Sequence, residues 1–248
     1  MTRLHENQVI IVTGGAQGIG LQISQYLESL GATIVIADIN VTQAQAAIET
    51  LPTKNGMAIY CDVTSEEATT KMAEAVIAAY GRIDVLINNA GCFPVKLFSQ
   101  MTEKDWRKVI DIDLTGTFLA TKSVYPYMEK AKKGKIVNMA SISGRVGGVG
   151  FTHYSAAKAG VIGFTKALAR EAGPLGIQVN CVAPGIIDTE TTRNVFPSFA
   201  LKDYTRNVPL GRLGHEEDIQ GVVSFLCSSN SDYMTGQCLT VDGGYTMI

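Results

Sequence analysis

Short runs of consecutive hydrophobic residues alternate along this chain with longer segments of helical pattern, each of ten or more residues. Strands that read as continuous hydrophobic runs are buried on both faces, and helices between such strands are typical of parallel sheets. The pattern therefore predicts an α/β fold in which helices cover both faces of a parallel sheet of about seven strands. The runs that predict strands are Gln8–Thr13, Thr33–Asp38, Met57–Asp62, Val85–Ala90, Lys135–Ala140, Ile177–Pro184 and Cys238–Gly244.

Helix boundaries are also marked in the sequence. Gly31 and Gly81 stand where a helix C-terminal glycine is expected, because glycine adopts a left-handed backbone at little cost. Thr102 opens the segment TEKDW, in which a hydroxyl N-cap precedes acidic residues. Neither a linker nor a repeat of about 20–50 residues is found. We expect one doubly wound Rossmann domain over residues 1–248, with a cofactor half to about residue 135 and a catalytic and substrate half beyond it.

The composition narrows the classes of function. The 248 residues are 46% hydrophobic and 18% charged, which is enough apolar material for a sizeable core. The formal net charge is −2 and no run of Lys or Arg is long, so nucleic acid is not an expected partner. Without an apolar signal region or a stretch of about 18 apolar residues, we expect a cytoplasmic protein with no membrane span. Five scattered cysteines indicate reduced thiols and no metal site.

The first hydrophobic run leads directly into TGGAQGIG, Thr13–Gly20. Glycines let the backbone turn tightly and approach a ligand, and the helix that follows presents unpaired N–H groups to an anion. A strand before, a helix after and an acidic residue further on are the context that a dinucleotide fingerprint requires. The spacing is G-x-x-x-G-x-G rather than G-x-G-x-x-G, and a tight turn without a ligand is the alternative. The segment predicts a pyrophosphate site.

The acidic residue is Asp38, which ends the second hydrophobic run 24 residues after Gly14. A carboxylate at this place accepts hydrogen bonds from both ribose hydroxyls of an adenosine, and it repels the additional phosphate of NADP. Its neighbours within residues 37–41 carry no positive charge, and neither does Gln17. We therefore predict NAD as the cofactor, the alternative being that Asp38 merely ends a strand.

A further motif, YSAAK, places Tyr154 and Lys158 four residues apart on one face of a predicted helix, a pair that by itself is common on helix surfaces. With it, five motifs resemble those of the short-chain dehydrogenase/reductase family, in the family's order and along the full length of the chain. They are Thr13–Gly20 (T-G-x-x-x-G-x-G), Asn88–Gly91 (N-N-A-G), Ser141 with Tyr154–Lys158 (Y-x-x-x-K, 13 residues after the serine), Pro184–Thr189 (P-G-x-x-x-T) and Val241–Gly244.

The resemblance implies a chemical role for three side chains. In this family the tyrosine exchanges a proton with the substrate oxygen, and a serine, here Ser141, hydrogen-bonds the same oxygen. A free tyrosine has a pKa of about 10, so a cation one helical turn away is expected to lower the pKa of Tyr154. By the same resemblance, Lys158 also holds the ribose hydroxyls next to the nicotinamide.

The resemblance also implies which residues bind the dinucleotide. The residues after the third strand are expected at the adenine, those after the fourth at its ribose, and Ile187 and Thr189 at the carboxamide. Asn88 is expected to tie adjacent strands instead. The implied cofactor-binding residues are Gly14, Gln17, Gly18, Ile19, Gly20, Asp38, Asp62, Val63, Asn89, Ala90, Gly91, Tyr154, Lys158, Pro184, Gly185, Ile187 and Thr189.

One position departs from the family. Asp113, in DLTGTF, stands where the family usually has an asparagine in the long helix before the fifth strand. That residue supports a water chain to the catalytic lysine, largely through its backbone carbonyl, which Asp113 retains. An aspartate loses the amide donor and adds a charge. We expect Asp113 to stay in the catalytic group, with activity retained and the pH dependence altered.

Candidate substrate residues flank the catalytic positions. Because no Arg or Lys is clearly aimed at the reacting centre, a moderately apolar secondary alcohol or ketone suits this lining. His153 has two open interpretations, a polar pocket residue or a structural histidine. A mobile lid is expected over about 186–210, in particular 190–208. The expected substrate residues are Ser141, Ser143, Phe93, Val95, Val146, His153 and Tyr154, with Phe196 and Phe199 in the lid.

These features predict an oxidoreductase that transfers a hydride between NAD(H) and a secondary alcohol or ketone, with Tyr154 as general acid and base. The main competing function is a 3-oxoacyl-acyl-carrier-protein reductase, which the chain also resembles. Those enzymes usually use NADPH, which Asp38 disfavours, and carry a basic residue where this chain has Leu175. A third hypothesis is a catalytically silent dinucleotide sensor, against which the intact catalytic residues argue.

The resemblance finally implies a homotetramer. The helices predicted over 103–130 and 152–172 are expected to pair with their copies across a two-fold axis. Small side chains on the second helix suit close helix packing, namely Ala156, Ala157, Ala159 and Gly160.

Overall fold

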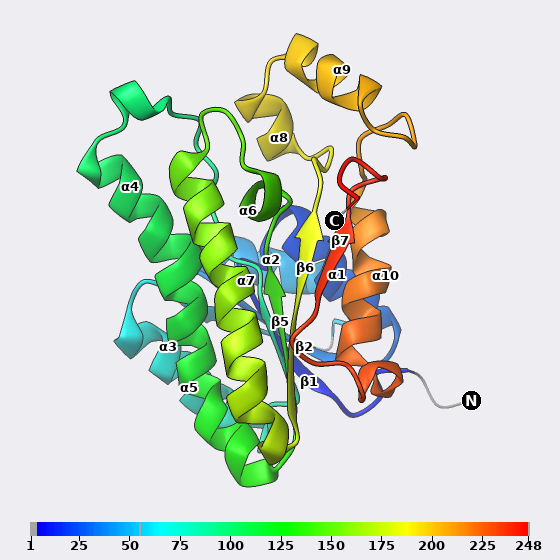
Figure 1. Cartoon of the computed structure of the whole chain (residues 1–248). Helices are drawn as coiled ribbons and strands as arrows, with labels where there is room; N and C mark the ends of the chain where they lie inside the picture. The colour runs from blue at the N-terminus through cyan, green and yellow to red at the C-terminus, as the bar shows by residue number, and fades with distance from the viewer. Residues whose placement is uncertain (1–3, 55, 248) are drawn as a thin grey trace.

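Seven parallel strands form one sheet in the computed structural model, which describes residues 4–54 and 56–247 (Figure 1). Their order across the sheet is β3-β2-β1-β4-β5-β6-β7, so the chain starts in the middle and winds outward in both directions. This arrangement confirms the predicted Rossmann fold. The strands are β1 (Val9–Thr13), β2 (Thr33–Asp38), β3 (Gly56–Tyr60), β4 (Val85–Asn88), β5 (Gly134–Met139), β6 (Ile177–Pro184) and β7 (Cys238–Val241).

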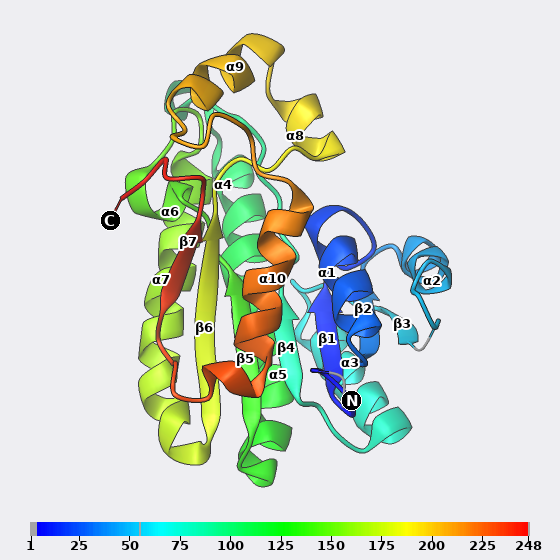
Figure 2. The same ribbon diagram turned by 90° about the vertical axis from the view of Figure 1, so that its right-hand side faces the viewer.

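Helices cover both faces of the sheet (Figure 2). One face packs against α1 (Gly18–Ser29), α2 (Val41–Glu49) and α10 (Glu216–Cys227). The opposite face packs against α3 (Glu66–Tyr80), α5 (Gly116–Ala131) and α7 (Thr152–Ala172), with α4 (Glu103–Ile110) packed against α7. Successive residues of β1 enter the two cores in turn, which is why its sequence reads as an unbroken hydrophobic run.

Several strands end earlier than the hydrophobic runs predict. β4 stops at Asn88 rather than Ala90, and β7 stops at Val241 rather than Gly244. After β4 the chain turns toward the neighbouring strand, because the backbone N–H groups of Asn89 and Ala90 both donate to Thr13 Oγ1, at 3.1 and 3.2 Å. The residues beyond these strand ends therefore form loops at the carboxyl end of the sheet instead of extending the strands.

The local helix signals are confirmed. Gly81 is the C-cap of α3 with φ of 73°, and Gly31, with φ of 102°, follows the C-cap of α1. Thr102 caps α4 in a reciprocal box, in which its hydroxyl accepts from the Asp105 N–H and the Asp105 carboxylate accepts from the Thr102 N–H. Such boxes satisfy backbone donors that the helix itself cannot satisfy.

The long helix predicted over 103–130 has an irregular turn in its middle. Residues Asp111–Thr115 form a π-helical turn between α4 and α5. A π turn holds an additional residue, and such turns are frequent at functional sites. Asp113 lies in this turn, and its backbone carbonyl accepts a hydrogen bond from Thr117 Oγ1 at 2.9 Å. The turn places the Asp113 side chain in the protein interior, where it is completely buried.

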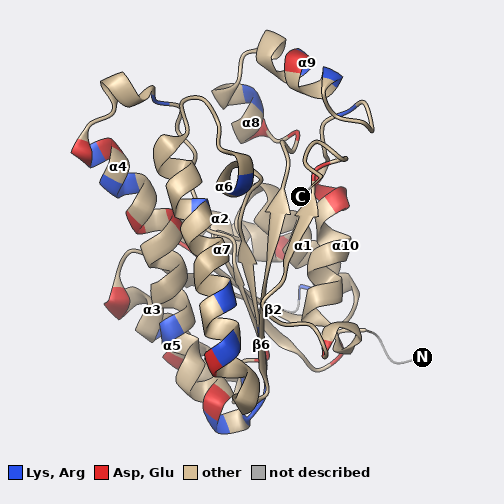
Figure 3. Ribbon diagram, in the orientation of Figure 1, with Lys and Arg blue, Asp and Glu red and all other residues tan. Residues whose placement is uncertain are grey.

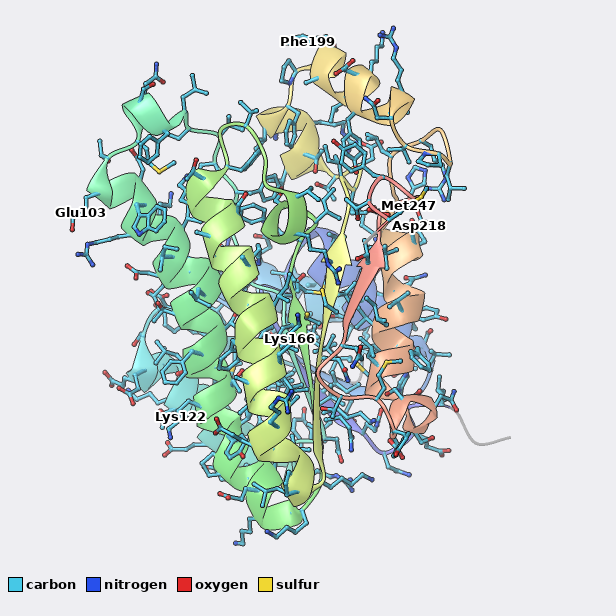
Figure 4. All side chains as sticks on the ribbon, in the orientation of Figure 1. Glu103, Lys122, Lys166, Phe199, Asp218 and Met247 are labelled. Carbon is cyan, nitrogen blue, oxygen red and sulfur yellow. The ribbon has the colours of Figure 1, made fainter. Side chains whose placement is uncertain are left out.

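Two short helices, α8 (Glu190–Val195) and α9 (Ser198–Arg206), rise above the carboxyl ends of the strands (Figures 1 and 2). Phe199 projects from α9 and is 74% exposed (Figure 4). Charged residues of both signs are spread along the outer helices (Figure 3). Within the described ranges, none of the helices combines the length and hydrophobicity that crossing a bilayer demands.

Candidate active site

A cleft of about 1210 Å³ opens at the carboxyl ends of the strands. Its walls come from the loops after β1 to β6, from the start of α7, from the π turn and from α8 and α9. This is where doubly wound sheets bind ligands, because the strand order reverses there and the loops separate. All seventeen residues implied to bind the dinucleotide line this cleft.

The glycine turn forms the part of the cleft that faces α1. Gly14 has φ of 62°, and a Cβ atom there would lie 2.8 Å from the Ala90 Cα. A Cβ on Gly20 would collide with the Asn89 side chain. Gln17, the N-cap of α1, makes no side-chain capping hydrogen bond, so the helix start is open to another acceptor. A backbone cradle at a helix N-terminus fits a pyrophosphate group.

Asp38 lies at the end of β2 with both carboxylate oxygens fixed by the backbone. Oδ2 accepts from the Ala16 N–H at 3.2 Å, and Oδ1 accepts from the Asn40 N–H at 3.0 Å. The carboxylate is half-buried beside the glycine turn, and it is part of the cleft wall. Its geometry fits the recognition of two ribose hydroxyls.

Three predicted catalytic side chains meet at the centre of the cleft. Tyr154 and Lys158 lie in the first two turns of α7, and Ser141 follows β5. The Ser141 hydroxyl hydrogen-bonds the Tyr154 phenol and accepts from the Ser143 N–H at 3.1 Å. The Lys158 ammonium lies 5.6 Å from the centroid of the Tyr154 ring. A hydroxyl, a phenol and an ammonium are thus held side by side.

Lys158 is buried, and its charge is paired. Its Nζ atom donates to the Met139 carbonyl at 2.9 Å and lies 3.0 Å from Asp113 Oδ1. Asp113 Oδ2 accepts from the Cys92 N–H at 3.0 Å. The predicted support of Lys158 by Asp113 takes a different form here, since the carboxylate contacts the ammonium directly and the backbone carbonyl bonds Thr117.

Lys158 acts to lower the Tyr154 pKa as expected, but the net shift of that pKa is upward in the protein by itself. Burial raises the pKa of Tyr154 above 10, Lys158 opposes that rise, and Asp113 adds to it. Burial lowers the pKa of Lys158, but the charges of Asp113 and Tyr154 outweigh this effect and raise it. Tyr154 is therefore a protonated phenol at neutral pH, next to a protonated lysine.

Most of the expected substrate residues line the cleft, among them Phe93, Ser143 and Val146. Two do not. Val95 lies outside the lining and packs on the backbone of Gly150. His153 is fully buried outside the lining, and its Nδ1 atom accepts from the Tyr154 N–H at 2.9 Å. The structure therefore favours the interpretation of His153 as a structural histidine.

Sequence reasoning missed further parts of the cleft wall. Phe151, three residues before Tyr154, lies with its ring centroid 5.9 Å from that of Tyr154 and 5.6 Å from that of Phe196. Phe151 precedes Tyr154 by about one helical turn, and this spacing could have indicated that the two side chains lie on the same side. Lys108 and Arg206 also reach the cleft, although no Arg or Lys was expected among the substrate residues. They come from α4 and α9, and no motif marks them.

The chain is similar to known proteins over nearly its whole length. The family model described as enoyl-(acyl carrier protein) reductase matches residues 14–246. The 3-oxoacyl-[acyl-carrier-protein] reductase FabG of Chlamydia muridarum is 41% identical over 98% of this chain and 99% of its own length. The (2S)-[(R)-hydroxy(phenyl)methyl]succinyl-CoA dehydrogenase subunit BbsD of Thauera aromatica is 38% identical over 98% of each chain. The crystal structure of gox2181 superposes with a TM-score of 0.94 at 36% identity, over 98% of this chain and 97% of that chain.

The fold and the cleft define an oxidoreductase of the doubly wound α/β class that uses a nicotinamide dinucleotide. Within that class, the chain belongs to the short-chain dehydrogenase/reductase family.

Proposed function

We propose that the protein reduces the 3-oxo group of an acyl thioester with NADH. The observation that carries the proposal is the meeting of Ser141, Tyr154 and Lys158 inside a cleft that also holds the glycine cradle and Asp38. The relatives named as 3-oxoacyl reductases support the substrate class, at about 40% identity over nearly the whole chain. This is the competing function of the sequence analysis, and the comparisons favour it over a simple secondary alcohol dehydrogenase.

The residues divide the reaction between them. A nicotinamide held at the centre of the cleft would supply the hydride for the carbonyl carbon. Tyr154 donates its proton to the carbonyl oxygen, which becomes a hydroxyl, while Ser141 hydrogen-bonds the same oxygen. Lys158, next to the Tyr154 ring, stabilises the phenolate that remains until a solvent proton replaces the one donated. In the oxidation direction the same groups act in reverse, with Tyr154 as the base.

Leu175 lies too far from the cleft to count against a carrier-protein substrate. Leu175 follows the last turn of α7, and the cleft lies at the first turn of that helix, some twenty residues away. Lys108 and Arg206 instead bring exposed cationic side chains to the cleft wall. Either can meet an anionic group on the arm that carries an acyl thioester.

The test measures kcat/KM with NADH for one 3-oxoacyl group in three forms: the acyl-carrier-protein thioester, the coenzyme A thioester and a neutral N-acetylcysteamine thioester. Simple ketones, secondary alcohols and sugars complete the panel. The proposal expects at least one thioester to exceed every simple ketone. A ketone or an alcohol that is the better substrate contradicts it.

A second candidate is the oxidation or reduction of a simple, apolar secondary alcohol or ketone. The aromatic wall around the catalytic tyrosine favours it, since the ring centroids of Phe93 and Phe151 lie 6.0 and 5.9 Å from that of Tyr154. Such rings pack well on a bulky hydrocarbon group. The same substrate panel separates the two candidates.

Replacement of Asp38 tests the choice of cofactor. In the wild-type protein, kcat/KM with NADH is expected to exceed that with NADPH by at least about tenfold, or about 1.4 kcal/mol, because a carboxylate repels the additional phosphate. Asp38→Ala is expected to lower the ratio of kcat/KM with NADH to kcat/KM with NADPH. Asp62→Ala is the matched control, because it removes a carboxylate from the same cleft and is expected to affect both cofactors equally. A wild-type preference for NADPH contradicts the prediction.

We also propose that the protein is a homotetramer with α5 and α7 at one interface. On α7, Ala157 is buried within the chain and Gly160 packs on Leu114, so Ala156 and Ala159 are the small residues left for a partner helix. Light scattering at micromolar concentration is expected to yield four times the 26.5 kDa of one chain. Ala159→Arg is expected to lower this mass, and a wild-type monomer contradicts the proposal.

A further inference from the structure

Asp113 and Lys158 form a buried ion pair at the centre of the cleft. Asp113 is 0% exposed and Lys158 is 4% exposed, and 3.0 Å separate Asp113 Oδ1 from Lys158 Nζ. The second carboxylate oxygen is held by the Cys92 N–H at 3.0 Å, so the carboxylate cannot rotate away without breaking that bond. The two residues come from different helices, and the contact fixes the ammonium on the side of the π turn.

Some of the groups around Tyr154 raise its pKa and others lower it. Lys158, on the same helix, and the Ser141 hydroxyl, after β5, favour the phenolate. Asp113, on the π turn, and the Cys92 thiol, after β4, favour the neutral phenol, as does burial. The Lys108 ammonium of α4 acts on Cys92. Among these groups only Asp113 combines a full negative charge with direct contact to Lys158.

The Asp113 backbone carbonyl accepts the Thr117 hydroxyl at 2.9 Å, from one turn further along the helix. The direct contact with Lys158 is made by the carboxylate. A carboxylate differs from an amide of the same size chiefly in its charge, and that charge opposes the loss of a proton from Tyr154.

We propose that Asp113 is a positioning residue whose carboxylate holds the Lys158 ammonium and offsets its charge, so that Tyr154 keeps its proton up to a higher pH than it would beside Lys158 alone. The inference rests on the proposed function only for its consequence in turnover. No enzyme alters the equilibrium between a ketone and its alcohol. Asp113 therefore changes only the pH dependence of the reduction rate. With Asp113 present, reduction is expected to run at full rate up to a higher pH.

The test compares the wild-type protein with Asp113→Asn, which keeps the size and the oxygen acceptor and removes the charge. Lys158 retains the Met139 carbonyl and the new amide oxygen as acceptors for its hydrogen bonds. The ionisation of Tyr154 is followed in the protein alone by tyrosinate absorbance. Matching Tyr154→Phe versions of both proteins subtract the other tyrosines among the nine. The pH dependence of kcat/KM for reduction is measured in parallel.

Asp113→Asn is expected to lower the midpoint of Tyr154 ionisation by about one to three pH units, the range typical of a charge placed next to an ionising group. The pH at which reduction loses half of its rate is expected to fall with it. Thr117→Val is the matched control, because it releases the Asp113 carbonyl and leaves the charge in place; neither midpoint is expected to move.

Two outcomes overturn the inference: an Asp113→Asn protein that is folded and has an unchanged tyrosinate midpoint, or a shift of equal size in Thr117→Val. A shifted midpoint in a protein that reduces no compound of the panel supports the inference about Asp113 and contradicts the proposed function. The absorbance titration thus separates a failure of one from a failure of the other.

Discussion

Tyr154→Phe is expected to lower kcat for ketone reduction by about 10²–10⁴-fold, the effect typical of losing a general acid. The variant keeps the aromatic ring, and with it the contacts to Phe93 and Phe151, whose centroids lie 6.0 and 5.9 Å away. Only the hydroxyl that reaches Ser141 is removed. Binding of NADH, measured by fluorescence titration, is expected to change little, so the loss belongs to the chemical step.

Tyr204→Phe is the matched control for this variant. Tyr204 also lines the cleft, but its hydroxyl accepts from the Ile186 N–H at 3.2 Å and its ring stacks on Tyr245. Burial raises the pKa of Tyr204 to about 12. Its loss is expected to change kcat far less than the loss of Tyr154. If Tyr154→Phe keeps more than about half of the wild-type kcat in an assay limited by chemistry, Tyr154 is not the proton donor.

Lys158→Ala is expected to destabilise the folded protein by about 3–5 kcal/mol, as well as to weaken NADH binding. Removal of one partner from a buried ion pair leaves the other charge buried without compensation. Here the charge left behind is that of Asp113, which is completely buried. Urea denaturation measures the change in the free energy of unfolding, provided that the m value, the slope of this free energy against urea concentration, is the same for both proteins.

The double variant Lys158→Ala/Asp113→Asn is expected to recover part of that stability, because the stranded charge is then absent. Lys71→Ala is the control for a lysine whose ion pair lies at the surface. Its partner Glu67 is 2.6 Å away, but the two side chains are 70% and 78% exposed. Water replaces such a contact, and no measurable loss of stability is expected. Equal losses for Lys71→Ala and Lys158→Ala would contradict the buried-pair argument.

Features that depend on neighbouring residues in the chain were predictable. The hydrophobic runs identify strands because a strand in a covered parallel sheet is buried on both faces. Gly81 and Thr102 end and begin helices through their own backbone and side-chain chemistry. The glycine turn, Asp38 and the Tyr154–Lys158 pair follow from fixed spacings next to these elements. All of them line the cleft where the motifs placed them.

Features that join distant segments were not predictable. Asp113 and Lys158 are 45 residues apart, and their contact depends on a π turn that the periodicity of the sequence does not reveal. Val95 lies close to Phe93 in sequence, yet it packs on Gly150 outside the cleft. Spacing along the chain cannot tell which of two neighbouring loop residues faces a ligand, because packing against remote segments decides it.

The sequence by itself determined the fold and the motifs that line the cleft, since each rests on local pattern, and Tyr154 as the proton donor stays a prediction from the family resemblance. The tertiary structure alone decided the direction of the Tyr154 pKa. From spacing, the cation one turn away was expected to lower it, but burial by surrounding elements and the charge of Asp113 raise it. The energy of an ionised group depends on everything packed around it, and that surrounding exists only after the chain has folded.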